Sequence, residues 1–545
     1  MILLSTFLIA TIATILLIPL CINLACKFNV LDFPDSRKIH CDPVPRIGGV
    51  AMAFGAFIPI LLWIPFNAFV KSVAIGCGIL IIFGLVDDIK DIGVKTKFSG
   101  QIVAGLIVIL YGGLKIKSLG IFGPAGFYLP DWLSIPLTLI VIVAVTNAIN
   151  LSDGLDGLAG GVTLITFLCI GYLSYLNNLH GFEIISVALI GAIFGLLRYN
   201  THPAIVFMGD SGSQLLGFVA IILSLALAQK SNEMNLILVL LILGIPVIDT
   251  FSVIVQRTLK GRSPFKADKN HLHHKIMNLG FYHSESVLIL YLLHATIVCL
   301  GFIFRYASAW FLLALYIVFS GGCIAVIFIA ERKGFKIRRF DFIDKVVKGE
   351  LRKLREENVI IRLSFKAVEI GFIFLILFSC FLPQHIHIYF SLSSMAMLGM
   401  ILLVWQIRKD WLSSIIEISV FLMIPFLVYL SEKDVAYLMN TTLIKAYAFS
   451  FGILIIFVLL TLKFTRRKGF KTTPMDFLIL FVALVVPYLP DETIRGWQMG
   501  LVAAKIVVLF FTFEVLKGEL RMNTKKLGIA GIMALMIISL RGFIG

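Results

Sequence analysis

The sequence contains few charged residues for its length. Asp, Glu, Lys and Arg make up 14% of the 545 residues, whereas about a quarter is usual in a soluble domain. Hydrophobic residues account for 59%, and the mean hydropathy is +1.00. This composition excludes an ordinary soluble globular protein and predicts a chain that crosses a membrane many times.

Several common motifs are also absent. The eight cysteines are scattered without a CxxC pair, so they indicate neither a metal site nor a disulfide framework. No phosphate-binding loop of the form GxxxxGKS or GxxxxGKT is present, which argues against an ATP-driven pump. Residues 1–20 lack a basic leader and a small-residue cleavage site, so we expect a retained first span rather than a signal peptide.

The positive charges are unevenly distributed. The net charge is +16, and most of the 47 Lys and Arg residues fall in alternate loops between apolar runs. Cytoplasmic loops of membrane proteins show this bias, so the charge is a signal of topology and does not indicate nucleic-acid binding. A basic inner face also attracts anionic lipids and anionic substrates.

Apolar runs of suitable length predict about 18 helices and an all-α polytopic fold, with about 11 spans in residues 1–330 and about 7 in residues 367–545. Residues 331–366 contain 12 Lys and Arg with apolar residues between them. They predict a basic amphipathic cytoplasmic segment on the inner leaflet, a solvated charged linker being the alternative. In the C-terminal module we expect no polar cluster within the spans, and we assign it no role.

One polar stretch, residues 147–161 (NAINLSDGLDGLAGG), separates two apolar runs. An ionised acid near the bilayer core costs several kcal/mol, so this stretch must lie at a membrane face or line a wet cavity. Asp153 and Asp156 are three residues apart, and on a continuing helix both carboxylates would share one face. A polar connecting loop is the alternative interpretation.

Four other polar segments fall on the same predicted side of the membrane if residues 27–46 are cytoplasmic, and both termini then lie outside. They are residues 33–49, the pair Asp87 and Asp88, residues 207–212 and residues 271–274. Paired acids raise the pKa of one carboxyl, which suits a base, or attract a divalent cation. Asp210 is a candidate Mg²⁺ ligand with Asn150 as a second, and capping of its own helix is the alternative.

Basic groups accompany these acids. His271, His273 and His274 lack a Cys partner or a second metal-binding motif, so we prefer donors to an anion such as a diphosphate over a zinc site. A second basic patch lies in a proline-stiffened loop and contains Arg37, Lys38, His40 and Arg46. Acids, basic loops and the absence of a nucleophilic Ser or Cys motif favour metal-assisted phosphoryl transfer.

The order of these motifs resembles that of a known family. The segments FPDSRKIH (33–40), PVPRIGG (43–49), VDD (86–88), NAINLSDGLDG (147–157), FMGDSG (207–212) and HLHH (271–274) occur in sequence. They are similar to the motifs of the bacterial polyprenyl-phosphate N-acetylhexosamine-1-phosphate transferases, the WecA/TagO type of the MraY-like glycosyltransferase 4 superfamily. The resemblance covers about residues 1–330 and includes the expected 11 spans.

This resemblance implies a reaction and a location. Undecaprenyl phosphate would attack the β-phosphate of a UDP-N-acetylhexosamine, giving a lipid-linked diphosphate sugar and UMP. Such enzymes initiate cell-envelope polysaccharides, including lipopolysaccharide O-antigen and teichoic acid, at the cytoplasmic face of the bacterial inner membrane. The RKxH…PRxGG loop favours GlcNAc as the donor sugar.

The resemblance also implies roles for individual residues. Asp87 would be the base, with Asp88 supporting it or the metal, and Asn150 and Asp210 would hold Mg²⁺, for which Mn²⁺ can substitute. Asp153 and Asp156 would shape the nucleotide pocket and belong with the candidate catalytic residues. Binding of the diphosphate or the sugar would fall to the remaining set, in which His273 is also a candidate catalytic residue: Arg37, Lys38, His40, Arg46, Asn147, His271, His273 and His274.

Two other interpretations stay open at this point. A lipid flippase or transporter would use the polar segments as a translocation path, although transporters place binding groups near the bilayer midplane rather than at the ends of spans. A transferase fused to an export or scaffolding module would also account for the length. The oligomeric state is open, and a homo-oligomer is compatible with the sequence.

Overall fold

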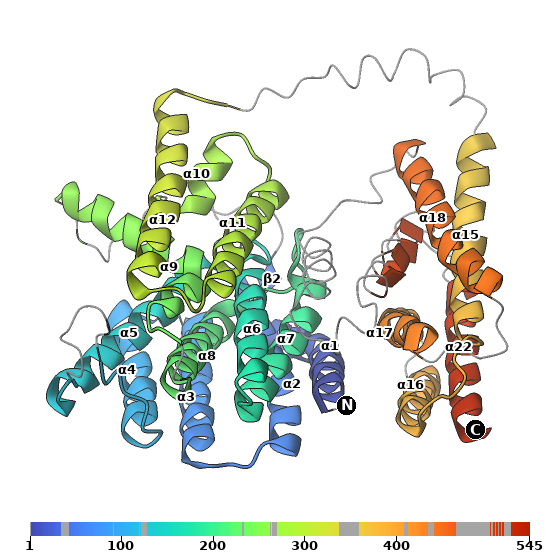
Figure 1. The fold of residues 1–545 in the computed structure, drawn as a ribbon, viewed down its shortest axis with the longest axis horizontal. Helices are drawn as coiled ribbons and strands as arrows, with labels where there is room; N and C mark the ends of the chain where they lie inside the picture. Colours follow the sequence, from blue (N-terminus) through green and yellow to red (C-terminus); the bar gives the residue numbers. More distant parts are fainter. Residues whose placement is uncertain are drawn as a thin grey trace. The chain divides into compact units, whose positions relative to one another are not determined.

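The computed structural model describes residues 2–33, 43–90, 92–118, 120, 128–231, 234–261, 263, 270–336, 359–407, 412–433, 441–464, part of 502–516, and 525–544. The chain divides into two compact units (Figure 1). The first comprises residues 1–338 with 473–475, and the second comprises the remainder. Each unit is described by itself.

The described part of the first unit is built from helices. They are α1 (Ile2–Phe28), α2 (Gly48–Trp63), α3 (Ala68–Lys90), α4 (Val94–Leu110), α5 (Asp131–Ser152), α6 (Leu158–Leu176), α7 (His180–Asn200), α8 (Gly209–Lys230), α9 (Leu238–Leu259), α10 (Leu272–Asn278), α11 (His283–Ile303) and α12 (Ala309–Arg332). Two short antiparallel strands, β1 (Leu31–Asp32) and β2 (Val44–Pro45), were not predicted.

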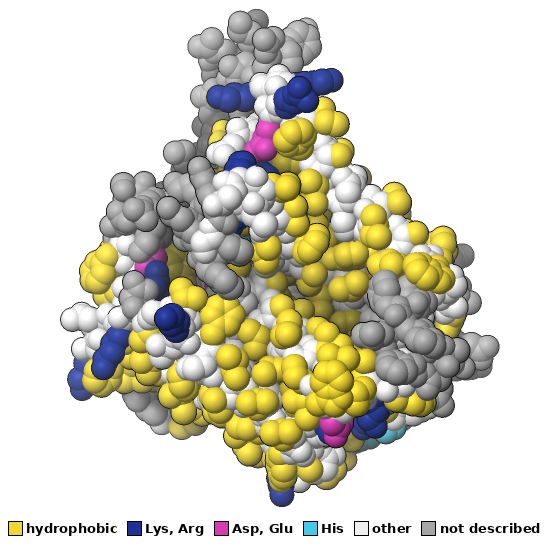
Figure 2. Space-filling view, turned by 90° about the vertical axis from the view of Figure 1, so that its left-hand side faces the viewer, with side chains coloured by type: hydrophobic (Ala, Val, Ile, Leu, Met, Phe, Trp, Pro, Cys, Tyr) yellow, Lys and Arg dark blue, Asp and Glu magenta, His cyan; other side chains and the backbone are white. Residues whose placement is uncertain are grey.

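Within the described residues, twelve helices are long and apolar enough to cross a membrane. The all-α polytopic fold is therefore confirmed, while the total of about 18 spans stays a prediction. Hydrophobic side chains cover most of the face in Figure 2, and Lys and Arg lie mainly toward its edges. Large apolar side chains such as Ile140, Phe251 and Val318 are more than 60% exposed, as expected of helices that face lipid.

Helix α8 is the centre of the first unit. It packs against α2, α3, α5, α6 and α9, and almost all of its apolar length is buried. Glycines let two neighbours approach its first turn closely: a Cβ on Gly49 would lie 2.3 Å from the Gly212 Cα, and one on Gly84 would lie 2.4 Å from the Ser211 Cα. Because only glycine fits these contacts, the start of α2 and the C-terminal part of α3 are held against Gly212 and Ser211 in the first turn of α8.

Helix α9 is broken in its middle. Gly244 has φ 24° and ψ −108°, and Pro246 follows within the same helix. Proline removes the N–H that would bond to the Ile242 carbonyl, and the Thr166 hydroxyl donates to that carbonyl at 3.2 Å instead. The Thr166 hydroxyl also contacts the buried ring of His294 at 3.0 Å, and that ring accepts the backbone N–H that follows Gly244. The break therefore leaves these backbone groups hydrogen-bonded, as a membrane interior requires.

The second unit contains α15 (Val359–Ser379), α16 (Ile388–Ile407), α17 (Leu412–Lys433), α18 (Thr441–Phe464) and α22 (Lys525–Ile544). Helix α15 begins within the segment predicted as a linker, and residues 337–358 of that segment lie outside the described residues. The role of this unit as an appended module stays a proposal.

The expectation that the second unit has no polar cluster is wrong. Lys505 forms an ion pair with Glu432, and its ammonium lies 4.4 Å from the centroid of the Tyr447 ring. The Tyr447 hydroxyl is within hydrogen-bond distance of Ser379 (2.7 Å) and Ser431 (3.3 Å). These residues are isolated in the sequence and meet only when the helices pack.

The contact between α3 and α8 can be tested by substitution. Gly84→Ala should destabilise the protein by about 1–3 kcal/mol, because the new methyl group overpacks the contact. Gly78→Ala is the matched control on the same helix, since a Cβ at Gly78 has no heavy atom within 4 Å. Thermal unfolding in detergent measures both variants. Equal melting temperatures for the two variants would contradict the close packing.

Candidate active site

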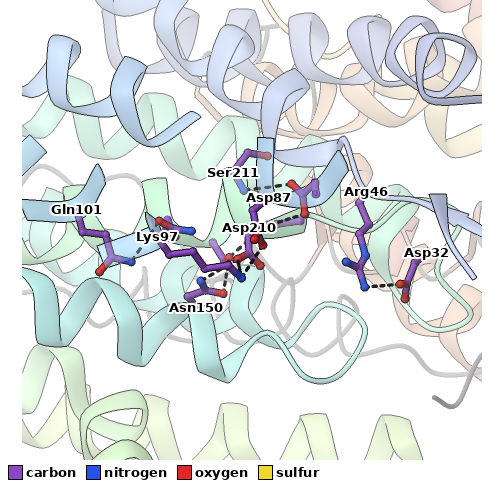
Figure 3. Close-up of polar contacts among 12 residues, drawn as sticks. Asp32, Arg46, Asp87, Lys97, Gln101, Asn150, Asp210 and Ser211 are labelled. Atoms are coloured by element: carbon purple, nitrogen blue, oxygen red, sulfur yellow. Dashed lines mark hydrogen bonds and ion pairs between the residues drawn. The ribbon is translucent and has the colours of Figure 1, made fainter. Parts of the chain in front are cut away.

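The structure brings two predicted acids together with a lysine and an asparagine at the ends of four helices (Figure 3). Asp87 lies in the last turn of α3 and Asp210 in the first turn of α8, while Lys97 lies in the first turn of α4. The Lys97 Nζ is 2.5 Å from the Asp87 Oδ2 and 2.8 Å from the Asp210 Oδ2. One ammonium group therefore holds two carboxylates from different helices together.

An amide from α5 completes this cluster. The Asn150 Nδ2 donates to the Asp210 Oδ2 at 3.4 Å, and the Asn150 Oδ1 accepts from the Ser213 hydroxyl at 3.3 Å. Asn147 is half-buried one turn earlier on α5. The second oxygen of Asp87, Oδ1, is buried without a hydrogen-bond partner among the described residues. The cluster thus offers several oxygen atoms close together, one of them unsatisfied.

Asp88 makes different contacts from Asp87. Its carboxylate accepts the backbone N–H of Asp210 at 3.1 Å and that of Ser211 at 3.4 Å. It therefore caps the start of α8 from a neighbouring helix, where a negative charge is favourable. The Asp210 carboxylate faces Lys97 and Asn150 instead, so the geometry gives no support to capping of its own helix by Asp210.

Asp153 and Asp156 lie in a turn and not on a helix, so the expectation of one shared helical face is wrong. Helix α5 ends at Ser152 and α6 begins at Leu158, with Gly157 at φ 78°. Burial, and then the negative charges of Asp210 and Asp156, raise the pKa of Asp153 to about 7. The positive charge of Arg46 opposes this shift.

Asp156 points toward two histidines. The His202 Nδ1 donates to the Asp156 Oδ2 at 2.7 Å, and the Ala204 N–H donates to the same oxygen at 3.2 Å. The Asp156 N–H donates to the His283 Nε2 at 3.2 Å, and the rings of His202 and His283 stack at 4.2 Å. Burial alone would raise the pKa of Asp156, but the His202 hydrogen bond and the His283 charge lower it below its usual value. Asp156 therefore fixes the turn to two neighbouring segments.

The HLHH segment is anchored by an acid of α9. The Asp249 Oδ2 accepts from the His271 Nδ1 at 2.9 Å, and the Asp249 Oδ1 accepts the Leu272 N–H at 2.8 Å. The His273 ring packs on Gly154, where an added Cβ would lie 2.4 Å from the ring nitrogen Nε2. The segment thus reaches the turn that carries Asp153.

His273 is a neutral group at physiological pH. Burial, and then the charge of His274, lower the pKa of His273 to about 3. The two rings lie 4.2 Å apart. His273 can therefore donate one hydrogen bond to an anion but contributes no positive charge.

Two other predictions, the basic patch and the HLHH histidines, can be compared with the structure. Arg46 pairs with Asp32 across the β1–β2 strands, while Arg37, Lys38 and His40 lie outside the described residues. Among the described residues, the group with the spacing of metal ligands is Asp156, His202 and His283, and it contains none of the HLHH histidines. This geometry gives no support to a zinc site in the HLHH segment.

Four residues of this region were not identified from the sequence: Lys97, His202, Asp249 and His283. Lys97 is one of three lysines between positions 90 and 97, and nothing local distinguishes it. Asp249 sits within an apolar run, where an isolated buried acid is a usable signal. His202 lies in the polar segment RYNTHP immediately before the motif that contains Asp210.

The fold and the site together define a membrane-embedded enzyme with a cluster of acids at its helix ends. Residues 70–228 match the model of glycosyl transferase family 4. A probable undecaprenyl-phosphate N-acetylglucosaminyl 1-phosphate transferase of Bacillus subtilis (strain 168) is 34% identical over 353 residues, covering 64% of this chain and 96% of that protein. The chain belongs to glycosyl transferase family 4, which confirms the resemblance found in its motifs.

Two other relatives have names of the same kind. The undecaprenyl-phosphate alpha-N-acetylglucosaminyl 1-phosphate transferase of Escherichia coli (strain K12) is 30% identical over 355 residues, covering 61% of this chain and 91% of that protein. The decaprenyl-phosphate N-acetylglucosaminephosphotransferase of Mycolicibacterium smegmatis is 35% identical over 299 residues, covering 49% of this chain and 74% of that protein. About a third of the chain or more is therefore additional to each of these matches.

The raised pKa of Asp153 predicts a pH dependence of stability. An unfolded aspartate has a pKa of about 4, whereas the folded value is about 7. Between these values the folded protein retains a proton that the unfolded chain has lost, so the free energy of unfolding should fall as pH rises from about 4 to about 7. Asp153→Asn should remove this part of the slope, as measured by thermal unfolding in detergent. An unchanged slope in the variant would refute the assignment.

Proposed function

We propose that the protein transfers GlcNAc 1-phosphate from UDP-GlcNAc to undecaprenyl phosphate, releasing UMP and initiating a cell-envelope polysaccharide. The observation that carries this proposal is the Asp87–Lys97–Asp210 cluster in a chain of glycosyl transferase family 4. The relatives act on polyprenyl phosphates according to their names, which supports the acceptor.

The reaction makes and breaks one bond to phosphorus. An oxygen of the acceptor phosphate attacks the β-phosphorus of the donor, and the bond from that phosphorus to the bridging oxygen breaks, so UMP leaves with the oxygen. The Asp87 Oδ1, which has no hydrogen-bond partner among the described residues, can take the remaining proton of the acceptor phosphate. Lys97 holds Asp87 in place through an ion pair and contributes a positive charge near the proposed position of the substrate phosphates.

The oxygen atoms of the cluster fit a divalent cation. Asp210 and Asn150 offer a carboxylate and an amide oxygen close together, the ligands that Mg²⁺ prefers, and Mn²⁺ accepts the same set. When bound, the ion would neutralise charge on the phosphates.

The residues around the acid cluster suit the nucleotide, the diphosphate and the sugar of the donor. Asp156 and its histidines hold the 153–157 turn in place, and we assign this turn to the nucleotide. His273 lies over the same turn and can donate a neutral hydrogen bond to the diphosphate or the sugar. Arg46, whose charge acts on Asp153, would bind phosphate.

The proposed location is the bacterial inner membrane with the site facing the cytoplasm. The concentration of Lys and Arg in alternate loops supports this orientation. The acids lie at the ends of helices rather than in their middles, which favours an enzyme at the membrane face over a transporter. The oligomeric state stays open.

The function is tested with purified protein, undecaprenyl phosphate and a panel of UDP-sugars. UDP-GlcNAc should give UMP and a lipid-linked GlcNAc diphosphate, and both products should require Mg²⁺. Asp210→Asn should lower turnover by at least about 100-fold, because a transition-state contact is lost.

Asp131→Asn is the matched control, because Asp131 is an exposed acid at the opposite end of α5, paired with Lys115. Its turnover should stay close to that of the unmodified protein. Turnover by Asp210→Asn at the rate of this control would rule out Asp210 as a ligand, and absence of UMP with every donor would overturn the proposed reaction.

A further inference from the structure

Two histidines and an aspartate from three segments meet at the 153–157 turn. Asp156 lies in this turn, His202 follows the end of α7, and His283 is the first residue of α11. Their ligand atoms, a carboxylate oxygen and two ring nitrogens, all lie within 4.8 Å of one another. The group contains neither Asn150 nor Asp210, which the proposed Mg²⁺ would use. It is therefore a second candidate site for a metal ion.

The ligand types determine which ion fits this group. Two imidazole nitrogens and one carboxylate oxygen are protein ligands of Zn²⁺ in sites that keep a fourth position open for water. Mg²⁺ and Mn²⁺ favour oxygen ligands instead, so the choice of ion separates this group from the acid cluster. The His202 side chain is 35% exposed, which gives water a route to the fourth position.

The hydrogen bonds of the group place a lone pair in position for an ion. The Asp156 N–H donates to the His283 Nε2 at 3.2 Å, so the proton of the neutral ring lies on Nδ1 and the Nε2 lone pair faces the turn. The His202 Nδ1 donates to the Asp156 Oδ2 at 2.7 Å. An ion bound here would replace that shared proton, which can move through water to the His202 Nε2 and free the Nδ1 lone pair. The His202 ring then stays neutral.

A small movement brings the three ligand atoms around one ion. With Zn–N and Zn–O bonds of about 2.1 Å, tetrahedral ligands lie about 3.4 Å apart, and the limit in this group is 4.8 Å. The Asp156 carboxylate is held by the Ala204 N–H, and the His283 side chain is buried. His202 is the partly exposed member and lies outside the helices, so it can make most of the adjustment.

We propose that Asp156, His202 and His283 form a Zn²⁺ site. A bound ion would join the 153–157 turn to the segment after α7 and to the start of α11. The observation that favours a metal site over a simple hydrogen-bonded contact is the stacking of the two rings at 4.2 Å, with a nitrogen of each ring facing Asp156. The inference goes beyond the proposed reaction and does not depend on it.

Isothermal titration calorimetry of Zn²⁺ into the tag-free, full-length protein, with excess Mg²⁺ present, tests the site. The unmodified protein should bind one Zn²⁺ per chain. His202→Asn should bind at least about tenfold more weakly, because the nitrogen ligand is replaced by an amide that can still donate to Asp156. Equal affinity in this variant, or no stoichiometric binding by the unmodified protein, would overturn the proposal.

The matched control is His180→Asn, because His180 is an exposed histidine at the other end of α7, paired with Glu183. It should bind Zn²⁺ as the unmodified protein does. His274→Asn should keep the same affinity, and a loss there would assign the ion to the HLHH segment and refute the proposal.

A second variant at position 202 separates ligation from folding. Cys is a Zn²⁺ ligand, so His202→Cys should retain the binding that His202→Asn loses. Zn²⁺ should raise the melting temperature of the unmodified protein and of His202→Cys but not that of His202→Asn, because an ion stabilises the folded state only where it binds. Loss of binding in both variants would show that His202 acts only through the structure of the turn, and the Zn²⁺ site would be rejected.

Discussion

The site depends on one ammonium group that is shared by two carboxylates. Lys97 joins Asp87 of α3 to Asp210 of α8, and both acids are largely withdrawn from water. Two acids brought together in apolar surroundings would repel each other and resist ionisation, and a positive charge between them opposes both effects. The two carboxylates can then lie together at the helix ends, where we propose that phosphates and a divalent cation bind.

Backbone contacts around this cluster fix the relative positions of the Asp87, Lys97 and Asp210 side chains. Glycines at positions 49 and 84 let α2 and α3 touch the first turn of α8, and Asp88 caps that turn from α3. The break in α9 helps to position the HLHH segment. The chain continues beyond Gly244 to Asp249, which anchors the HLHH segment above the turn containing Asp153. Small residues and backbone hydrogen bonds thus position charged groups that would not assemble unaided.

Much of the fold and part of the site could be predicted from the sequence. The length and apolarity of the helices predicted the membrane class, and the motifs located Asp87, Asn150 and Asp210, which the structure brings together. The helical interpretation of DGLDG was wrong because Gly157 takes a positive φ that ends the helix. Residues that form ion pairs across a long stretch of sequence, such as Lys97 and Asp210, have no local sequence pattern that identifies them as partners. The same holds for Glu432 and Lys505, which become a pair only through packing.

The central proposal is that the Asn150 and Asp210 oxygens hold a divalent cation beside Lys97. Electron paramagnetic resonance of Mn²⁺ titrated into the purified protein, with UDP-GlcNAc present, measures this binding directly. The unmodified protein should show one bound ion per chain, and Asp131→Asn should match it, whereas Asp210→Asn should bind at least about tenfold more weakly because a charged ligand is lost. Equal Mn²⁺ affinity in all three proteins would contradict the account.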